Sequence, residues 1–319
     1  MKRARDAPVA DSEISYVGTG YVRKRSGSLS LPSTPKEYVI QLKSSSSAAT
    51  ARIAGARVLV VDDVSSGWTT GEEEKDIGQS WYGTITTTGL VALSDRPIFL
   101  YEAGKYDGAI TAYFEAILFG NTAGVTYTIY LYDLTTGTEV THVSTTATTP
   151  TRVRSGAITL INGHEYYAYA IRVSQANVTI YVPTCKIIIQ QSGSIRKTQL
   201  HKKTFFYGLR NSTTPARYTR DFLLDEGNLP PKRTYYHEAT LRCASGGLAQ
   251  ADIFDLTDGV SLPGSLISTT STSYVRLRSG PLSPTNLHEY DERDWSGVSG
   301  VYMYIAAGYF IIDVELEEV

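Results

Sequence analysis

Side chains able to carry out catalysis are few in this sequence, and they stand in no known catalytic spacing. The histidines are His142, His164, His201, His237 and His288. None begins a His-Glu-x-x-His zinc motif, because the residue four places after His164 is Ala168 and the one after His288 is Glu292. The Gly-x-Ser-x-Gly elbow, the Walker loop and Cys-x-x-Cys are also missing from the sequence. We therefore expect no enzyme, no catalytic residue and no cofactor.

Carboxylates are the next candidates for chemistry. A glycosidase needs two acids that face each other at about 5–10 Å. The matching acids here are Glu115 with Glu238 and Glu165 with Glu289, and the members of each pair stand 123 or 124 residues apart. Repetition of one structural position explains such pairs better than an active site does.

A weak calcium candidate lies near a turn in the last third of the chain. Asp252, Asp255 and Asp258 would offer the hard oxygen ligands that Ca²⁺ prefers. The matching stretch earlier in the chain holds only one acid, Asp133. A repeated metal site is therefore not expected, and the favoured prediction is no metal.

Paired arginines are the most distinctive polar feature. They occur as Arg23 with Arg25, Arg152 with Arg154, and Arg276 with Arg278. Residues i and i+2 of a strand point to the same side, so each pair forms a stripe of two guanidinium groups. One interpretation is a repeated contact with an anion or an acidic glycan. The favoured one is a cross-strand pair with the glutamate of the Glu-Tyr strand that follows, namely Glu37, Glu165 or Glu289.

Tyrosine is unusually frequent, with 23 Tyr against 8 Phe. The residues that could stack on a sugar are Tyr166, Tyr167, Tyr169, Trp295, Tyr302 and Tyr304. Amphipathic rings also suit subunit interfaces and the edges of sandwich cores. The interface or core interpretation is favoured, and a glycan platform stays the alternative.

These residues belong to an internal repeat. Arg-x-Arg-Ser-Gly at 152–156 recurs at 276–280, and a Glu-Tyr pair follows nine residues after each glycine. Tyr-x-Glu-Ala and Asp-Leu-Thr-x-x-Gly recur in the same order, with offsets of 123 and 122 residues. Anchors in one order at nearly one offset indicate two copies of a module of about 123 residues. A third, partial copy opens the chain with Arg23-Lys24-Arg25-Ser26-Gly27.

Each copy alternates apolar and polar residues as strands do. Val125, Tyr127, Ile129, Leu131 and Asp133 are predicted to share one face of a strand. Gly137 is then expected to take a positive φ in a hairpin turn. About eight such strands per copy favour an all-β sandwich or jelly roll. The predicted order is a partial β module at 1–63, an acidic linker at 64–79, a module at 80–190, a linker at 191–197 and a module at 198–319.

Composition narrows the function further. The chain has 319 residues, of which 19% are charged, and a formal charge of −2. A small negative net charge does not attract the chain to nucleic acid. The apolar runs are far shorter than the ~18 residues of a membrane helix, and the basic N-terminus lacks the apolar segment of a secretory signal. Two cysteines, Cys185 and Cys243, cannot build a disulfide framework, which predicts synthesis in a reducing cytoplasm.

The series of a Tyr/Phe-Asp-Leu-Thr-x-x-Gly hairpin, Arg-x-Arg-Ser-Gly and a Glu-Tyr strand resembles tandem jelly-roll modules of bacteriophage virion proteins and of prokaryotic surface proteins. The resemblance implies the fold and supplies no catalytic residue. With the unmatched partial module, it favours a non-enzymatic virion component, such as a fibre, tail or capsid-surface subunit. Its expected partners are copies of itself and other virion or surface proteins. The alternatives are a carbohydrate-binding or adhesive surface module and an extracellular prokaryotic filament subunit.

Overall fold

The structure, a computed structural model, is built of antiparallel β-sheets, with a short 3-10 helix in the first half of the chain. It describes residues 68–93, 97–195, 197–217, 222–224, 226, 229 and 232–315, with residues 13–15, 17, 26 and 29. Met1–Val60 and Val61–Val319 are separate compact units. Arg23, Arg25 and Glu37 lie outside the described residues, as does nearly all of the partial module predicted at 1–63.

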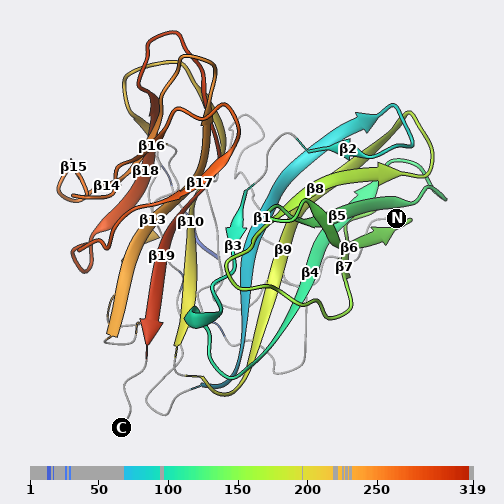
Figure 1. The fold of residues 1–319 in the computed structure, drawn as a ribbon, viewed down its shortest axis with the longest axis horizontal. Coiled ribbons are helices and arrows are strands. Elements are labelled where there is room, and N and C mark those ends of the chain that lie inside the picture. The colour runs from blue at the N-terminus through green and yellow to red at the C-terminus, as the bar shows by residue number, and fades with distance from the viewer. Residues whose placement is uncertain are drawn as a thin grey trace. The chain divides into compact units, whose positions relative to one another are not determined.

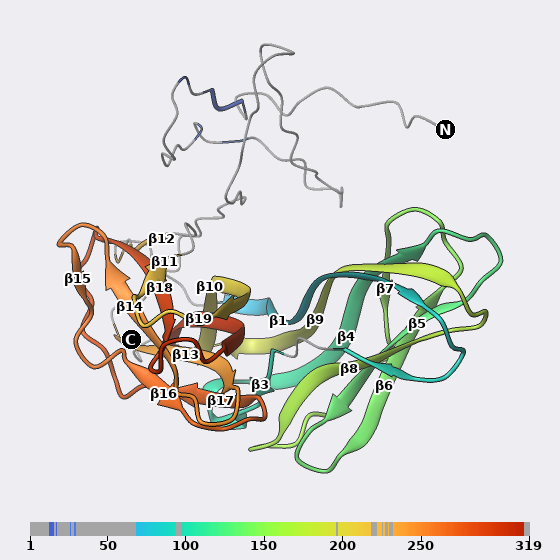
Figure 2. The same ribbon diagram turned by 90° about the horizontal axis from the view of Figure 1, so that it is seen from above.

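The first copy of the repeat, here called the first repeat, covers residues 68–195 and forms two sheets (Figures 1 and 2). Its elements are β1 (Trp68–Ile85), β2 (Val91–Ala92), β3 (Phe99–Leu100), the helix η1 (Ala103–Lys105), β4 (Ala109–Gly120), β5 (Tyr127–Asp133), β6 (Thr138–Thr145), β7 (Thr151–Arg154), β8 (Glu165–Val173) and β9 (Val178–Ile195). One sheet has the order β1-β9-β4-β7. The other has the order β2-β8-β5-β6, with β3 also paired to β8.

The second repeat covers residues 197–315 and follows the same plan. Its strands are β10 (Lys197–Arg210), β11 (Ala216–Arg217), β12 (Phe222–Leu223), β13 (Lys232–Cys243), β14 (Ala249–Asp255), β15 (Val260–Ser261), β16 (Ile267–Thr269), β17 (Val275–Arg278), β18 (Glu289–Ser296) and β19 (Met303–Glu315). The sheet orders are β10-β19-β13-β17 and β11-β18-β14-β15, with β12 on β18 and β16 on β14. The internal repeat read from the sequence is thus a repeat of strand order.

Alternation along the strands builds the core of the first repeat. The predicted face is buried, with Val125 just before β5 at 2% exposure and Tyr127, Ile129 and Leu131 of β5 at 0%, while Thr128 and Tyr130 on the other face are each 8% exposed. These side chains pack with buried residues of the other sheet, such as Phe114, so apolar area is removed from water between two sheets. The architecture is consistent with a β-sandwich. The turn glycine after β5 has the predicted positive φ, at 71°.

The acidic linker predicted at 64–79 is wrong over its described part. Residues 68–79 are the first part of β1, which pairs with β9 from Trp68 to Ile85. Glu72 and Glu74 are not buried on this strand, while Lys75 and Ile77 are, so a run of charges here belongs to a paired strand.

The linker predicted at 191–197 is also wrong. Strand β9 continues to Ile195 and β10 begins at Lys197. Both flanks are paired, because Trp68 lies opposite Ile195 and Lys197 lies opposite Glu315. Small polar residues therefore continue the sheet here, and the two repeats join with almost no connecting loop.

Among the described residues, no helix is long and apolar enough to span a membrane.

Candidate functional site

The paired arginines of the first repeat converge on one buried carboxylate. Glu115 of β4 lies opposite Arg154 of β7 in the sheet register. Its Oε2 is 2.7 Å from Arg152 Nη2 and 2.7 Å from Arg154 Nε, and Arg154 Nη2 lies 3.2 Å from Glu72 Oε1. Burial raises the pKa of the Glu115 carboxyl, but the hydrogen bonds from both arginines outweigh it and the net shift of the pKa is downward.

The second repeat has the same cluster. Glu238 of β13 lies opposite Arg278 of β17, and Arg278 Nε is 2.8 Å from Glu238 Oε2. Arg276 also donates a hydrogen bond to this carboxylate. The side chain of Glu238 is only 2% exposed, so its buried charge requires the compensation that these two guanidinium groups provide.

The predicted pairing of the arginines with the Glu-Tyr glutamate of their own repeat is therefore wrong for Arg152 with Arg154 and for Arg276 with Arg278. Strand β7 belongs to the sheet of β4, whereas β8, which begins with Glu165, belongs to the other sheet. The connection from β7 to β8 crosses between sheets instead of closing a hairpin. The partners are Glu115 and Glu238, which the sequence had marked only as matching positions.

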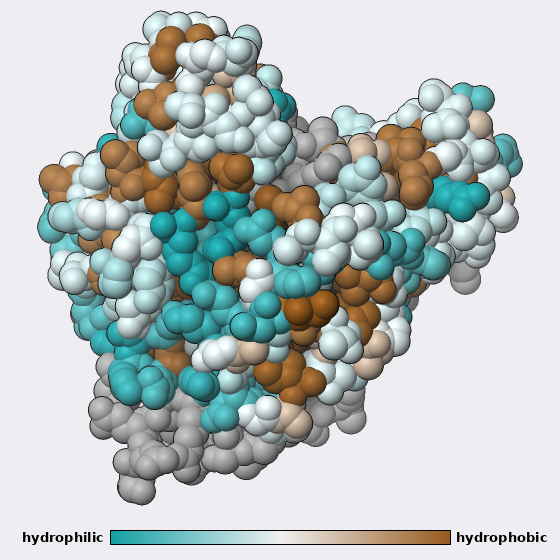
Figure 3. Space-filling model, viewed as in Figure 1, coloured by the Kyte–Doolittle hydropathy of each residue, from teal (hydrophilic) through white to brown (hydrophobic). Residues whose placement is uncertain are grey.

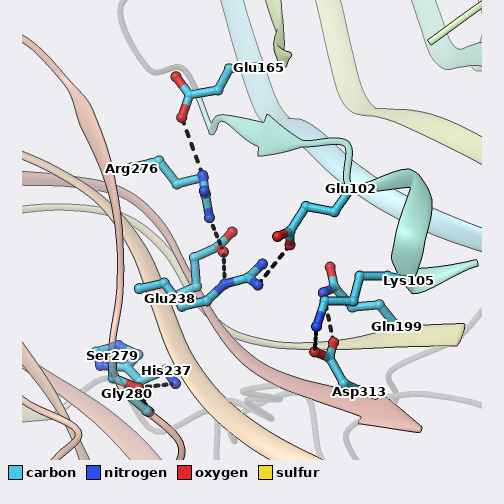
Figure 4. A network of polar contacts seen from close by, with 11 residues as sticks. Glu102, Lys105, Glu165, Gln199, His237, Glu238, Arg276, Ser279, Gly280 and Asp313 are labelled. Atoms are coloured by element: carbon cyan, nitrogen blue, oxygen red, sulfur yellow. Dashed lines mark hydrogen bonds and ion pairs between the residues drawn. The ribbon is translucent and has the colours of Figure 1, made fainter. Parts of the chain in front are cut away.

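The cluster of the second repeat also binds the first repeat (Figure 4). Arg278 Nη1 lies 2.8 Å from Glu102 Oε2, and Arg276 Nε lies 3.3 Å from Glu165 Oε1. We call Glu238, Arg276 and Arg278 the docking face of the second repeat. Burial lowers the pKa of Arg278, but the charges of Glu238 and Glu102 outweigh it and the net shift is upward, which favours the charged form.

The carboxylates that reach this face come from one edge of the first repeat. Glu165 begins β8, and Glu102 stands two residues after β3, whose Leu100 lies opposite Glu165. We call Glu102 and Glu165 the donor edge of the first repeat. Figure 4 shows the side chain of Glu165 pointing toward Arg276, and Glu102 reaches Arg278 at 2.8 Å. The space-filling view shows hydrophilic side chains gathered between the two repeats (Figure 3).

Further contacts widen the junction between the repeats. Lys105 Nζ is 2.5 Å from Asp313 Oδ2. The Tyr309 hydroxyl donates to the carbonyl of Asp76 at 2.6 Å. Lys75, whose side chain is 1% exposed, donates to the carbonyl of Gln199. Buried polar groups of the two repeats are therefore satisfied by each other.

The backbone of the first repeat takes part as well. The amide of Ile98 donates to Thr240 Oγ1 at 3.2 Å. Contacts of this junction therefore come from β1, the segment 98–105 and the start of β8, and they meet β10, β13, β17 and β19. Chemically, the junction is a hydrogen-bonded, charge-paired surface between two β units.

The first repeat carries the same arginine cluster in a more open state. Arg152 is 50% exposed, whereas Arg276 at the matching position is 12% exposed. Arg154 is 28% exposed and Arg278 16%. We call Glu115, Arg152 and Arg154 the open face of the first repeat.

The weak calcium candidate is a turn with its own partners. Asp255 Oδ1 accepts the backbone N–H groups of Thr257 at 2.9 Å and of Asp258 at 3.1 Å, and Oδ2 lies 2.8 Å from His288 Nδ1. Asp255, Asp258 and His288 each place one ligand atom within 4.8 Å of the others. The third predicted acid, Asp252, is bound instead by an arginine of β18, at 3.0 and 2.6 Å.

The first repeat makes the same turn without a second acid. Asp133 Oδ1 accepts the N–H groups of Thr135 at 2.9 Å and of Thr136 at 3.2 Å, and Oδ2 lies 2.6 Å from His164 Nδ1. Satisfying the backbone of a tight hairpin therefore accounts for Asp133 and Asp255 alike.

The aromatic residues singled out in the sequence do not form one platform. Tyr166 is 1% exposed in the core, and its hydroxyl accepts the N–H of Ile161 at 2.7 Å. Tyr167 is 6% exposed and packs edge-on against Tyr169, with ring centroids 5.6 Å apart. The other three lie in the second repeat. Trp295 and Tyr304 are half-buried, and Tyr302 is 44% exposed.

A partly exposed aromatic stripe was missed in the sequence. Tyr82 of β1, Tyr181 of β9 and Phe119 of β4 lie side by side in the sheet register. Phe119 and Tyr181 stack with centroids 4.7 Å apart, Tyr181 and Tyr82 are 6.3 Å apart, and Tyr82 is 74% exposed. These residues are far apart in the sequence, so only the strand register brings them together.

A buried polar pair in the second repeat was also missed. His237 Nε2 lies 3.1 Å from Glu292 Oε1, and both side chains are at most 1% exposed. Burial lowers the pKa of His237, but its hydrogen bond to Glu292 and the charge of Glu292 outweigh this, so the net shift is upward. The matching positions of the first repeat are the buried apolar residues Phe114 and Ala168.

No known protein family and no curated protein matches the sequence. Among solved structures, the T13 particle of infectious bursal disease virus is 10% identical with a TM-score of 0.28, covering 79% of this chain and 71% of that one. The VP2 subviral particle of that virus is 12% identical with a TM-score of 0.27, covering 81% and 74%. The exported protein XepA of PBSX is 9% identical with a TM-score of 0.22, covering 80% and 89%. Likenesses this weak support no conclusion about function.

Proposed function

We propose that this chain is a non-enzymatic structural protein that assembles through its β modules, as a subunit of a virion. The observation that carries the proposal is the junction between the repeats. There the most distinctive residues of the repeat, Arg276 and Arg278, bind Glu165 and Glu102 of the neighbouring repeat. The Arg-x-Arg-Ser-Gly motif of the second repeat thus forms a contact between two β units, as expected of a protein that assembles from β units.

The strand order supports a jelly roll for each repeat. A jelly roll packs two four-stranded antiparallel sheets in a double Greek key and is used in viral capsids and lectins. Here β1-β9-β4-β7 and β2-β8-β5-β6 recur as β10-β19-β13-β17 and β11-β18-β14-β15. We propose two tandem jelly rolls, at 68–195 and 197–315, with a partial module before them.

The virion assignment rests on this architecture together with the resemblance in sequence. Tandem modules joined by almost no linker suit a stiff repeated subunit, and its proposed partners are copies of itself and other virion proteins. The proposed location is the virion after synthesis in a host cytoplasm. Fold and function are separable, so the assembly claim requires its own test.

Light scattering across a concentration series of the full chain provides that test. The proposal predicts a mass that exceeds the 34.9 kDa of one chain, as a closed oligomer or a growing polymer forms. A mass that stays at one chain up to high concentration would refute self-assembly.

A carbohydrate-binding role is the second candidate, and the aromatic stripe of Tyr82, Tyr181 and Phe119 favours it. The three rings stack on one another, and Tyr82 at the end of the stack is 74% exposed, so its ring offers an apolar surface to a sugar ring. The test is binding to a glycan array by the wild type and by Tyr82→Ala, with Tyr302→Ala as a control at an exposed tyrosine of the other repeat. Glycan binding that is lost only with Tyr82 would support this role, and an array without any binding would refute it.

A further inference from the structure

The arginine cluster occurs twice in the chain but is covered by a neighbouring repeat only once among the described residues. In the second repeat, Glu165 of the first repeat lies on Arg276, which is then 12% exposed. In the first repeat, the matching Arg152 keeps its contact with Glu115 and remains 50% exposed. The same surface is therefore present in a covered and in an open form within one molecule.

The open face and the docking face differ in the carboxylates that contact their arginines. On the docking face, Arg278 receives a second carboxylate from the donor edge of the first repeat. On the open face, Arg154 already has a second carboxylate, Glu72 of its own β1, at 3.2 Å. Within the described residues, Arg152 pairs with Glu115, which it shares with Arg154. The open face is thus short of one carboxylate, at Arg152.

The chain carries the missing group at the matching position of its other repeat. Glu165 begins β8 and lies opposite Leu100 of β3. Glu289 begins β18 and lies opposite Leu223 of β12 in the same register. Both glutamates also follow the same hairpin, because their backbone N–H groups each donate at 3.0 Å to the hydroxyl of a turn threonine. The second repeat therefore has a donor edge built like that of the first.

We propose that the open face of the first repeat binds the second repeat of another copy of this chain, with Glu289 placed on Arg152. The contact would copy the junction already present inside the chain, where Glu165 lies on Arg276. Because one end of each copy would bind the opposite end of the next, the contact is heterologous and builds a ring or an open polymer. This inference rests on the proposed function and names the surfaces that perform it.

Charge reversal at the two predicted contact residues tests the proposal on the full chain. Arg152→Glu alone would place two acidic side chains against each other, and Glu289→Arg alone would place two basic ones together. Each is expected to weaken association about tenfold or more, because like charges across an interface are strongly unfavourable. Arg172→Glu is the matched control, since Arg172 is an exposed arginine of the first repeat on the other sheet, where it donates to the carbonyl of Thr88.

Mixing the two variants supplies the decisive measurement. In a heterologous contact, the unchanged Glu289 of the R152E chain meets the unchanged Arg152 of the E289R chain. The substituted open face of the R152E chain likewise meets the substituted donor edge of the E289R chain, again as a pair of opposite charges. Light scattering should therefore show assembly restored in the equimolar mixture and in the R152E/E289R chain. Circular dichroism of each variant establishes that the sheets are intact.

The outcomes separate this inference from the proposed function. If the wild type stays monomeric, the proposed function fails. If the wild type assembles but R152E assembles as R172E does, or if mixing restores nothing, the chain is an assembly protein that uses other surfaces and this inference is wrong. R152E could instead make residues 1–60 newly sensitive to protease while assembly persists. In that case residues 1–60 bind the open face of the first repeat, and this inference of a second copy on that face is wrong.

Discussion

The buried pair of His237 and Glu292 gives a sharp prediction, because the chain contains its own apolar counterpart. The matching positions of the first repeat hold Phe114 and Ala168. Backbone contacts establish the match for the histidine: the serine of Arg-x-Arg-Ser-Gly donates to the carbonyl of Phe114 in one repeat and to that of His237 in the other, at 2.8 Å in both. One fold thus supports an ionisable and an apolar version of the same core site.

Breaking the pair from one side should be costly. His237 and Glu292 are 0% exposed, so Glu292→Ala removes the hydrogen-bond partner of His237 Nε2 and leaves space beside the ring, while Nδ1 keeps the carbonyl of Ser265. Removal of one partner of a buried pair costs about 3–5 kcal/mol. Replacing both partners, as His237→Phe with Glu292→Ala, installs the combination of the first repeat and should be neutral or stabilising by up to about 4 kcal/mol.

Urea unfolding of the full chain measures these changes. Trp295 lies in β18 of the second repeat, and replacing Trp68 and Trp81 by Phe leaves it as the only fluorescent tryptophan. The double-mutant cycle should give a coupling of at least about 3 kcal/mol. His142→Phe, at an exposed side chain of the first repeat, is the control and should change stability by less than about 0.5 kcal/mol.

The same pair sets a pH dependence whose sign follows from the raised pKa of His237. A histidine whose pKa is raised in the folded state stabilises fully below its unfolded value near 6.5, and this contribution is lost as pH rises through the folded pKa. Stability of the second repeat should therefore fall by up to about 1.4 kcal/mol per pH unit in that window. The H237F/E292A chain should lack this slope. A double variant as unstable as E292A, or an unchanged slope, would refute the reasoning.

Three other perturbations follow from single contacts. Glu115→Gln should reduce the loss of stability in acid, because folding lowers the pKa of the Glu115 carboxyl. The stabilisation by the ionised carboxylate is fully present above about pH 4.3 and is lost as the pH falls through the folded pKa. Thermal unfolding of both chains from pH 2 to 6 measures this difference. Asp255→Ala should lower the free energy of unfolding by about 2 kcal/mol, because two backbone N–H groups of the turn lose their acceptor. Adding Ca²⁺ or a chelator should leave the Tm of the wild type unchanged. A rise of Tm with Ca²⁺ would contradict the interpretation of Asp255 as a residue that only stabilises the turn. Gly120→Ala should lower the free energy of unfolding by about 1–3 kcal/mol or more, because a Cβ there would lie 1.8 Å from Cζ of Tyr127. Gly104→Ala is the control and should leave stability unchanged, because no atom lies within 4 Å of its added Cβ. Equal Tm values for the two variants would contradict the packing around Gly120.

Much of the fold could be predicted because its information is local or repeated. Alternation of side chains along β5 gives its buried face, and the turn glycine Gly137 gives its hairpin. The recurrence of short motifs gives the duplication without any knowledge of sheet order. Acidic and small residues misled the prediction of linkers, since polar residues on the outer face of a paired strand look like a loop in sequence.

The candidate site was only half predictable. The arginine pairs stand out in the sequence, but their partners depend on which strands share a sheet, and β7 joins β4 instead of β8. The contacts of Arg276 and Arg278 with the first repeat are set by docking between repeats, which no local pattern encodes. The buried pair had a signal that alignment of the two copies could have found, since His237 and Glu292 stand where the other copy has apolar residues.

Electron microscopy of the purified full chain tests the central claim most directly. Because each copy would present an open face at one repeat and a matching donor edge at the other, the account predicts rings or filaments of subunits joined head to tail. At the lowest concentration at which the wild type assembles, these assemblies should be lost for the R152E chain and should return when it is mixed with E289R. Fields of single 34.9 kDa particles at every concentration of the wild type would contradict the claim that this chain is an assembling structural subunit.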